Sequence, residues 1–227
     1  MRYGAWVVVA AASLLVAGCG GSGAGQREST TDPVDGTVSR VEVDSDAGGL
    51  RLAAGEQASV QQELRWTGDA RPRVEHRLDG GTLRITVRCP DDGDEDCQAG
   101  LVVTVPAQAS ARAEVAAGGI EVAGLTGEQD LRSSAGSVTG TGLGPGAVSA
   151  NSSAGGVDLT FTAAAPEVTA ESSAGSVDVR VPAGPVYDVT AETTAGSARI
   201  EVPDQPGADH RVTARSSAGS VSVAPAG

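Results

Sequence analysis

The sequence predicts an all-β protein, a single-stranded parallel β-helix (a solenoid) that follows an irregular or antiparallel region of strands. Two observations carry this prediction. Apolar and polar residues alternate over most of the chain, as in half-buried strands. A corner of small residues also recurs six times, and its glycines are 18, 19, 20, 21 and 23 residues apart: Gly118, Gly136, Gly155, Gly175, Gly196 and Gly219. Such spacing is typical of stacked coils that lengthen only at their turns.

The first 18 residues are predicted to be a signal peptide. A positive start at Met1 and Arg2 precedes an apolar run of 13 residues, 5–17, which is too short to cross a bilayer core of ~30 Å as a helix. The tetrapeptide Val-Ala-Gly-Cys at 16–19 resembles the lipobox of bacterial lipoproteins. That resemblance implies that Cys19 is the lipid attachment site, whereas the alternative is an ordinary secretory signal that ends near a cysteine.

Residues 19–36 are predicted to form a flexible tether. They contain Gly-Gly-Ser-Gly-Ala-Gly and then Gln-Arg-Glu-Ser-Thr-Thr-Asp-Pro, with almost nothing apolar to bury. A tether of this composition has a root-mean-square span of about 20 to 25 Å. We therefore expect a protein anchored to the cell membrane through an acylated cysteine, with its folded part, residues 37–227, on the extracytoplasmic side.

The charge of the chain argues against nucleic-acid partners. The formal net charge is -13, and the sequence contains no lysine. A chain this acidic is repelled by polyanions. Residues 19–227 are enough for one domain with a substantial core.

Residues 37–106 are predicted to form amino-terminal strands. Asp79-Gly80-Gly81 lies between two alternating runs and indicates a tight hairpin. Cys89 and Cys97 flank a turn, and in an exported chain such a pair indicates a disulfide, worth roughly 2.5 kcal/mol by the chain-entropy estimate. His76 is interpreted as an ordinary strand residue, since the other histidine is far away in the sequence.

The turn between the two cysteines is strongly acidic. Its carboxylates make a weak candidate for a Ca²⁺ site, because Ca²⁺ binds several oxygen ligands: Asp91, Asp92, Asp94, Glu95 and Asp96. Their order does not follow the spaced pattern of an EF-hand. A solvated acidic turn is the favoured interpretation, and we predict no metal site and no cofactor.

Residues 107–227 are predicted to form the repeated coils. In each, two short strands flank a corner at which glycine reaches a positive φ without a Cβ clash. The Ser-Ser or Thr-Thr pair before five of these glycines invites a catalytic interpretation, but a hydroxyl needs a base, and His210 has no evident orienting partner. We expect the hydroxyls to hold turns together. The outward columns are mixed in sign and should be solvated: Asp158, Asp178, Arg180, Arg199 and Glu201 on one face, and Glu171, Asp188, Glu192 and Arg215 on another.

The two ends of the solenoid should differ. The amino-terminal strands are expected to cover one end. The other end is expected to be the last strand of the chain, directly before residues 224–227. An uncapped edge invites pairing, so this carboxy-terminal edge is predicted to be a partner or self-association surface, or else to be blunted by Pro225.

A run of residues resembles a known family. Cys89, Pro90 and Cys97, a strand that ends in Val105-Pro106, and repeated Ala-Gly corners through Val221 resemble the DUF4097-like "putative adhesin" domains of bacterial envelope proteins. The resemblance covers residues ~40 to 224. It implies a parallel β-helix and supplies no catalytic residues to transfer.

Two functions are compatible with these features. The favoured hypothesis is a membrane-tethered, non-enzymatic lipoprotein that presents its β-solenoid surface to an envelope protein or wall component for binding or adhesion. The alternative is a polysaccharide-active β-helix enzyme, in which carboxylates on one face would do acid and base work. The thin aromatic content and the lack of an acidic cluster outside one turn favour the first.

Overall fold

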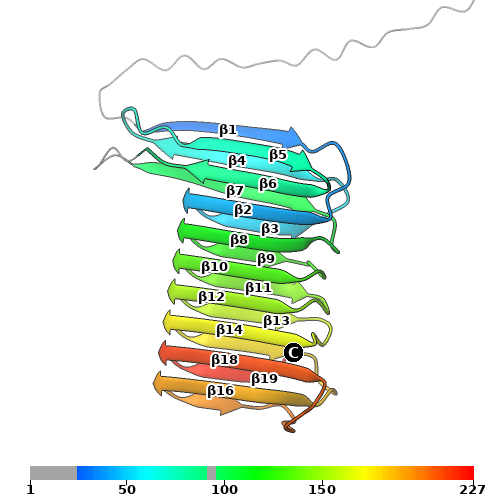
Figure 1. Cartoon of the computed structure of the whole chain (residues 1–227). Helices are drawn as coiled ribbons and strands as arrows, with labels where there is room; N and C mark the ends of the chain where they lie inside the picture. The colour runs from blue at the N-terminus through cyan, green and yellow to red at the C-terminus, as the bar shows by residue number, and fades with distance from the viewer. Residues whose placement is uncertain (1–24, 91–95) are drawn as a thin grey trace, which may run out of the picture.

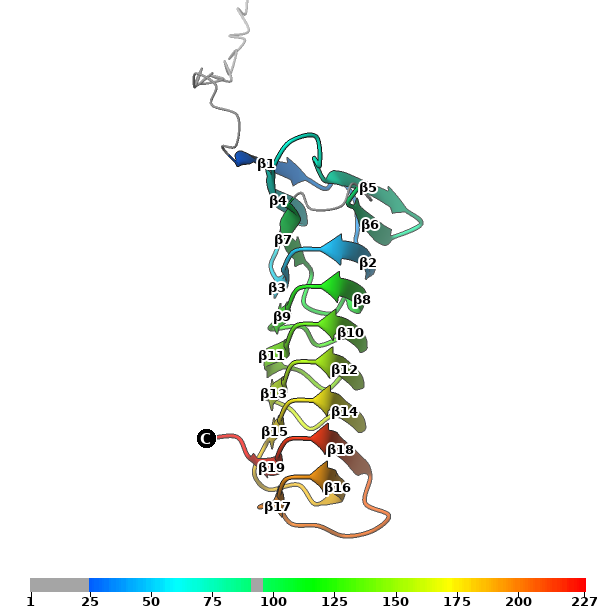
Figure 2. The same ribbon diagram turned by 90° about the vertical axis from the view of Figure 1, so that its left-hand side faces the viewer.

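The computed structural model describes residues 25–90 and 96–227, and all regular structure in them is β-strand. Figures 1 and 2 show a tall stack of coils with two sheets along its length. In these residues no helix is long and apolar enough to cross a membrane. The predicted all-β solenoid with an antiparallel amino-terminal region is confirmed.

Strands of one sheet lie back to back with those of the other. The 10-stranded sheet contains, in spatial order, β1 (Gln26–Pro33), β4 (Ser59–Trp66), β7 (Cys97–Val105), β3 (Leu50–Ala54), β9 (Ile120–Ala123), β11 (Val138–Leu143), β13 (Val157–Phe161), β15 (Val177–Val181), β19 (Val221–Pro225) and β17 (Ala198–Ile200). The 9-stranded sheet contains, in spatial order, β16 (Tyr187–Ala195), β18 (His210–Ala218), β14 (Glu167–Ala174), β12 (Val148–Ala154), β10 (Gln129–Ala135), β8 (Ser110–Ala117), β2 (Arg40–Ala47), β6 (Thr82–Arg88) and β5 (Arg73–Asp79).

Each coil contributes one strand to each sheet, and like strands pair in parallel. In β14 the buried residues Val168 and Ala170 alternate with half-buried Thr169 and Glu171, and in β15 Val177 and Val179 are buried in the same way. The alternate residues of both sheets thus point into one continuous apolar core. The predicted inward alternation is confirmed.

The stack contains a seventh coil in addition to the six that the repeated corners predict. Strands β2 and β3 form it, and β2 pairs with β8 so that Ala47 lies beside Ala117. Its corner, Ala47-Gly48-Gly49-Leu50, has the same pattern as residues 117–120. The similarity was hidden because residues 55–109, mostly the strands β4 to β7, are inserted before the next coil.

Those inserted strands form the amino-terminal cap. Strand β4 pairs antiparallel with both β1 and β7, and β5 pairs antiparallel with β6. In turn, β7 and β6 pair in parallel with β3 and β2 of the first coil. The cap therefore extends both sheets and covers the core at this end.

Residues 26–33, which we expected in the flexible tether, form strand β1. The segment is polar, but its Glu28, Thr30 and Asp32 are half-buried at every second position. The amide of Gln62 donates to the Thr30 hydroxyl at 2.7 Å, and Arg71 pairs with Glu28 at 2.6 Å. Pairing with β4 thus orders a segment that has little apolar surface of its own. The polar composition of this segment, taken alone, predicts a flexible tether.

The prediction that the carboxy-terminal strand forms the open end was wrong. The last coil of the chain, β18 and β19, lies between the coil of β14 and β15 and the coil of β16 and β17. In Figure 1 the red β18 is seen above the orange β16. Strand β19 pairs on both sides, with β15 and β17. The open end is therefore formed by residues 187–200, and the chain turns back to insert its final coil.

Side chains give a physical reason for this order. In the 9-stranded sheet, Arg215 lies between Glu171 and Glu192, with which it pairs at 3.6 and 3.1 Å. Sequential stacking would place the two glutamates side by side, and like charges on adjacent strands are destabilising. The same order places Arg211 between Glu167 and Asp188.

Packing in the other sheet favours the same order. The inserted coil buries Val221 to 1 % exposure, whereas the smaller Ala198 lies exposed at the end. The inserted order also separates Asp178 from Arg199, with Ser222 between them. By the same register it separates Arg180 from Glu201, with Ala224 between them, so the charges of this sheet oppose the inserted order, whereas its apolar packing and the charges of the 9-stranded sheet favour it.

Candidate functional site

The corner glycines bring the coils into their closest contact. All six predicted corner glycines have φ between +148° and +153°. A Cβ on Gly136 would overlap the carbonyl of Gly118, and a Cβ on Gly155 would overlap that of Gly136. Because L-residues disfavour such φ values and no side-chain atom fits, the corners require glycine for their architecture.

The first hydroxyl of each corner pair is used in the structure. The hydroxyl of Ser152 donates to the carbonyl of Gly136 at 2.8 Å, and that of Ser172 donates to Gly155 at 2.8 Å. The other members of the ladder make the same bond to a neighbouring coil: Ser133 to Gly118, Ser216 to Gly175 and Thr193 to Gly219. The prediction that these hydroxyls hold turns together is confirmed.

The second hydroxyl of each pair points outward into an open groove of about 780 Å³. We call this the corner groove. Its floor carries the exposed hydroxyls of Ser134, Ser153, Ser173, Ser217 and Thr194. Its wall is the outward column of the 9-stranded sheet, which reads, from the cap toward the open end, Glu114, Arg132, Asn151, Glu171, Arg215 and Glu192.

Electrostatics hold the wall of the corner groove in place. The hydrogen bond from Arg215 to Glu192, with Glu171 on its other side, raises the pKa of the guanidinium above its usual value. Arg132 pairs with Asp130 at 3.1 Å. The groove thus offers hydroxyl donors and acceptors on its floor and fixed charges of both signs on its wall. Such a surface can bind polar groups, and neither histidine lines it.

The histidines lie elsewhere. His76 is a half-buried residue of β5 and lies opposite Ile85 of β6, as its interpretation as a strand residue predicts. The Nδ1 of His210 lies 2.9 Å from the carbonyl of Ala165, and its ring centroid is 5.8 Å from that of Tyr187. His210 is therefore oriented by a backbone carbonyl and packs beside a buried tyrosine.

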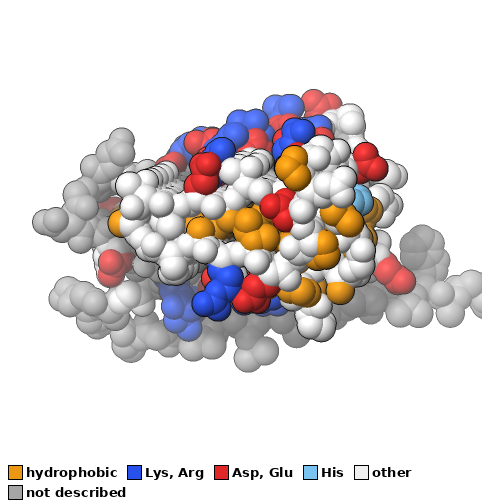
Figure 3. Space-filling model, turned by 90° about the horizontal axis from the view of Figure 1, so that it is seen from below, with side chains coloured by type: hydrophobic (Ala, Val, Ile, Leu, Met, Phe, Trp, Pro, Cys, Tyr) orange, Lys and Arg blue, Asp and Glu red, His pale blue; other side chains and the backbone are white. Residues whose placement is uncertain are grey.

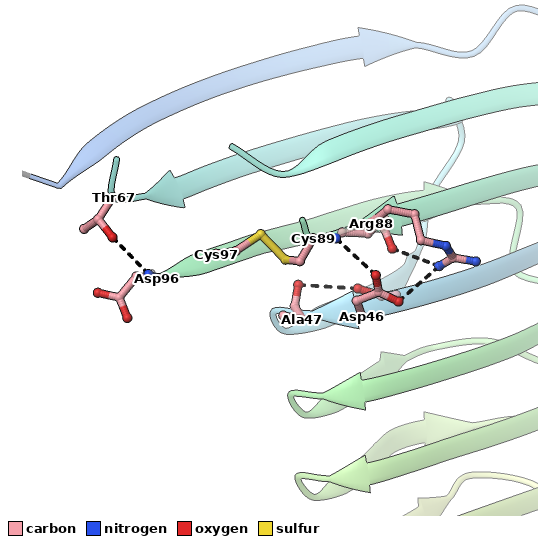
Figure 4. Close-up of a disulfide and its surroundings, with 9 residues drawn as sticks. Asp46, Ala47, Thr67, Arg88, Cys89, Asp96 and Cys97 are labelled. Atoms are coloured by element: carbon pink, nitrogen blue, oxygen red, sulfur yellow. Dashed lines mark hydrogen bonds and ion pairs between the residues drawn. A yellow bond between two sulfur atoms is a disulfide. The ribbon is translucent and has the colours of Figure 1, made fainter. Parts of the chain in front are cut away.

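The predicted disulfide is present. Cys89, directly after β6, is bonded to Cys97, the first residue of β7, so the bond joins the two sheets of the cap (Figure 4). The Asp46 carboxylate accepts from the Cys89 amide at 3.1 Å. Arg88 forms two bonds with Asp44, at 2.9 and 2.7 Å, which lower the pKa of that carboxyl.

The weak Ca²⁺ candidate falls mostly outside the described residues, because Asp91, Asp92, Asp94 and Glu95 lie there. Asp96 is described, and its amide donates to the Thr67 hydroxyl at 2.9 Å. Over residues 25–90 and 96–227, no group of three or more His, Cys, Asp or Glu could hold a metal ion.

The predicted lipid attachment site, Cys19, also lies outside the described residues, together with the signal peptide. Of the outward columns, Asp158 pairs with Arg180 at 2.9 Å and lies beside Asp178 in the register of β13 and β15. Arg199 pairs with Glu201 at 3.6 Å on the open coil. The structure therefore places Glu171, Glu192 and Arg215 in the groove wall, leaves Asp188 outside it beside Arg211, and places the other predicted polar residues on the other sheet.

Comparison with protein families assigns this architecture. Residues 104–224, more than half of the chain, match the family described as Toastrack DUF4097. The match covers the coils from β8 to β19 and ends just before the carboxy terminus. No curated protein matches the sequence.

Two solved structures have the same fold. A "putative cell adhesion protein" from Clostridium sporogenes ATCC 15579 is 9% identical, with a TM-score of 0.55, over 88% of this chain and 100% of that chain. A "putative adhesin" from Bacteroides fragilis NCTC 9343 is 13% identical, with a TM-score of 0.52, over 88% of this chain and 97% of that chain. At these identities the likeness establishes the fold alone.

Proposed function

Because the chain belongs to the Toastrack DUF4097 family, we propose that it is a membrane-tethered, non-enzymatic envelope lipoprotein whose β-solenoid surface serves binding or adhesion. The observation that carries this proposal is the corner groove. It runs across the strands β8, β10, β12, β14, β18 and β16 and repeats one polar pattern from coil to coil. A repeated polar surface matches an extended partner better than a single small molecule.

The state of the hydroxyls supports binding over catalysis. The inner hydroxyls already donate to glycine carbonyls, and a nucleophile needs a base within hydrogen-bond reach. The outer hydroxyls are free to exchange hydrogen bonds with a partner. The two similar structures are described as a "putative cell adhesion protein" and a "putative adhesin", which agrees with this use of the fold.

The proposed anchor orients the solenoid. Only residues 20–25 separate Cys19 from strand β1, and six residues reach at most about 20 Å when extended. An acylated Cys19 therefore keeps the cap end close to the lipid, on the extracytoplasmic face of the cell membrane. The open coil lies at the far end of the stack (Figure 2).

The proposed partner is an envelope protein or a wall component. Photo-crosslinking from the groove floor tests this. A crosslinker at Ser153 or Ser173 of the full chain in cells should capture one discrete partner, and the matched position Asp178, on the other sheet, should not. Equal capture from all three positions, or none, would remove the groove from the proposal.

The anchor is tested separately. Cys19→Ala should move the chain from the membrane fraction to the soluble envelope or medium, without changing its fold. Retention of Cys19→Ala in the membrane would contradict the acylated cysteine. Cleavage of wall or capsular glycans by the purified chain would instead support the enzymatic alternative.

A further inference from the structure

The hydrogen-bond ladder of the solenoid stops at the open coil. In every earlier coil the corner glycine amide donates to the next coil, for example Gly175 to Ala218 and Gly219 to Ala195, both at 2.9 Å. The second strand does the same, for example Val221 to Ser197 at 2.8 Å. Within the described residues no coil follows Gly196 and Ala198, so these two amides have no equivalent carbonyl to donate to.

The apolar core is also open at this end. Ile200 is 40 % exposed, whereas its counterparts Val223 and Val179 are 0 % and 1 % exposed. Ala198 is exposed and Val189 and Ala191 are half-buried, although the equivalent residues of inner coils are buried. Figure 3 looks onto this end and shows hydrophobic side chains along the middle of the face, with charges on both sides.

The connecting loop covers only one part of the open coil. The carbonyl of Pro203 accepts from the Tyr187 amide at 3.0 Å, and Asp204 accepts from the Val189 amide at 3.0 Å. Asp188 accepts from the amide of Gly207 at 3.1 Å. This loop therefore protects the start of β16, and it leaves the edge from Thr190 through Ile200 without a strand beside it.

We propose that a second copy of this chain covers the open coil, end to end, about a twofold axis that is perpendicular to the solenoid axis and parallel to the strands. Strands β16 and β17 run in opposite directions, because the chain turns back at Gly196. That axis places β16 of one copy antiparallel to β17 of the other, and the reverse pair forms by symmetry. Both cores then continue across the contact.

Charges at the two edges fit this pairing. Directly opposite residues of an antiparallel pair point to the same face. Glu192 of β16 and Arg199 of β17 both point outward, and their side chains are 65% and 74% exposed. The twofold pairing places Arg199 of each copy on the same outward face of the joined sheet as Glu192 of the other, in addition to their pairs with Glu201 and Arg215 in the same chain, while Ile200 faces the apolar residues of β16.

The contact closes at two copies. At the other end the core is covered by the antiparallel cap, whose two edge strands are the polar β1 and β5, with alternating charges on β5 at Arg73, Glu75, Arg77 and Asp79. Charged edge strands resist further pairing. A head-to-tail contact, which would extend into fibres, is thereby disfavoured.

The oligomeric state of the full chain in mild detergent tests the proposal. Light scattering coupled to gel filtration should show a concentration-dependent dimer. Ile200→Asp should weaken it by at least roughly tenfold, because a charge would be buried in the contact. Val102→Asp is the matched control, since Val102 is 36 % exposed but lies on β7 of the cap, and it should leave the dimer unchanged.

A charge reversal tests the pairing itself. Arg199→Glu should weaken the dimer, and Glu192→Arg in the same chain should restore it. Because Glu192 also pairs with Arg215 within the chain, the melting temperature of each variant at low concentration is measured first, and the dimer is compared only among variants that remain folded. A wild-type chain that stays monomeric at all concentrations, or equal effects of Ile200→Asp and Val102→Asp, would overturn the proposal. Failure of rescue by the double variant would overturn the twofold pairing.

The dimer has a consequence that rests on the proposed lipid anchor. The two tethers lie at the far ends of the pair, so the contact joins two opposed membrane surfaces. Vesicles that carry the full chain should cluster, and Ile200→Asp should abolish the clustering. Dimers in detergent without vesicle clustering would contradict the anchored arrangement and leave the dimer itself supported.

Discussion

The two ends of the solenoid meet the same problem in different ways. At the amino-terminal end, antiparallel strands and a disulfide cover the core, and edge strand β5 carries alternating charges. At the other end the chain inserts its last coil inward and leaves a weaker coil, with Ala198 and Ile200 exposed, as the edge. The comparison shows that covering one end of the core requires many additional residues. An uncovered end instead leaves backbone hydrogen-bonding groups available to a partner.

The largest effect should come from a corner in the middle of the stack. Gly155→Ala places a Cβ on the carbonyl of Gly136 at φ +151°, so we expect a loss of roughly 3 kcal/mol or more, or failure to fold. Gly184→Ala is the control, since it has φ +111° but no atom within 4 Å of the added Cβ. Comparing the melting temperatures of the two variants separates the steric overlap of the Cβ from the strain of a positive φ. Equal losses of stability in the two variants would contradict a role for steric overlap.

Removing the disulfide should loosen the cap and spare the open end. The double change Cys89→Ser and Cys97→Ser should cost about 2.5 kcal/mol in the chain-entropy estimate. Hydrogen exchange should become faster in β6 and β7, with β16 and β17 unchanged. Faster exchange at both ends would mean that the solenoid opens as one cooperative unit.

Truncating an apolar side chain should cost more stability in an inner coil than at the equivalent position of the open coil. Val179→Ala removes a side chain that is 1 % exposed and should cost about 2 kcal/mol. Ile200→Ala deletes more atoms but starts at 40 % exposure, so it should cost less than about 1 kcal/mol in the monomer. Denaturant unfolding at low protein concentration measures both. A larger loss for Ile200→Ala would mean that the open end is covered.

The order of the last two coils should be sensitive to one charge. Arg215→Glu places three acidic residues in a row with Glu171 and Glu192 and should lower the melting temperature of the chain, by an amount that solvent screening keeps small. Arg215→Gln should cost less, because it removes the two ion pairs without adding repulsion. The difference between the variants should shrink in high salt. A difference that does not depend on salt would contradict an electrostatic cause.

The smallest effect should come from acid at the cap. Arg88 lowers the pKa of Asp44 below its ordinary value of 3.8, so this pair stabilises the fold above that value and stops doing so as pH falls through the lowered pKa. The Asp44 side chain is 61% exposed, which limits the effect to well under about 1 kcal/mol. Asp44→Asn should flatten the acid limb of the melting temperature slightly. An unchanged acid limb would assign that limb to other carboxylates.

Much of the fold could be predicted because its rules are local. The corner glycines were found from spacing, and the Cys89 and Cys97 pair from its position around a turn. The coil at Gly48 was missed, although its corner repeats residues 117–120, because the inserted cap breaks the period. Strand β1 was missed because its order comes from pairing with β4 and not from its own apolar content.

The corner groove was predicted only in part. The sequence identified its hydroxyl pairs and its outward charges. It predicted a structural role for the hydroxyls and solvated faces for the charges, and did not join the two in one site. The register joins them, since the outer hydroxyls lie two residues along the strand from the charged column and on the same face. Among the six coils from β8 to β19, the longest connection is residues 201–209, and this length was a sign in the sequence that the last coil turns back.

By itself the sequence determined the repeated unit: alternation set which side chains face the core, and glycine set where the backbone turns. The tertiary structure alone decided the order of the units and which edge is left open. Neighbouring coils accept one another through nearly identical hydrogen bonds and apolar faces, so local pattern does not distinguish one stacking order from another. The order depends on contacts between coils far apart in the chain, such as Arg215 between Glu171 and Glu192.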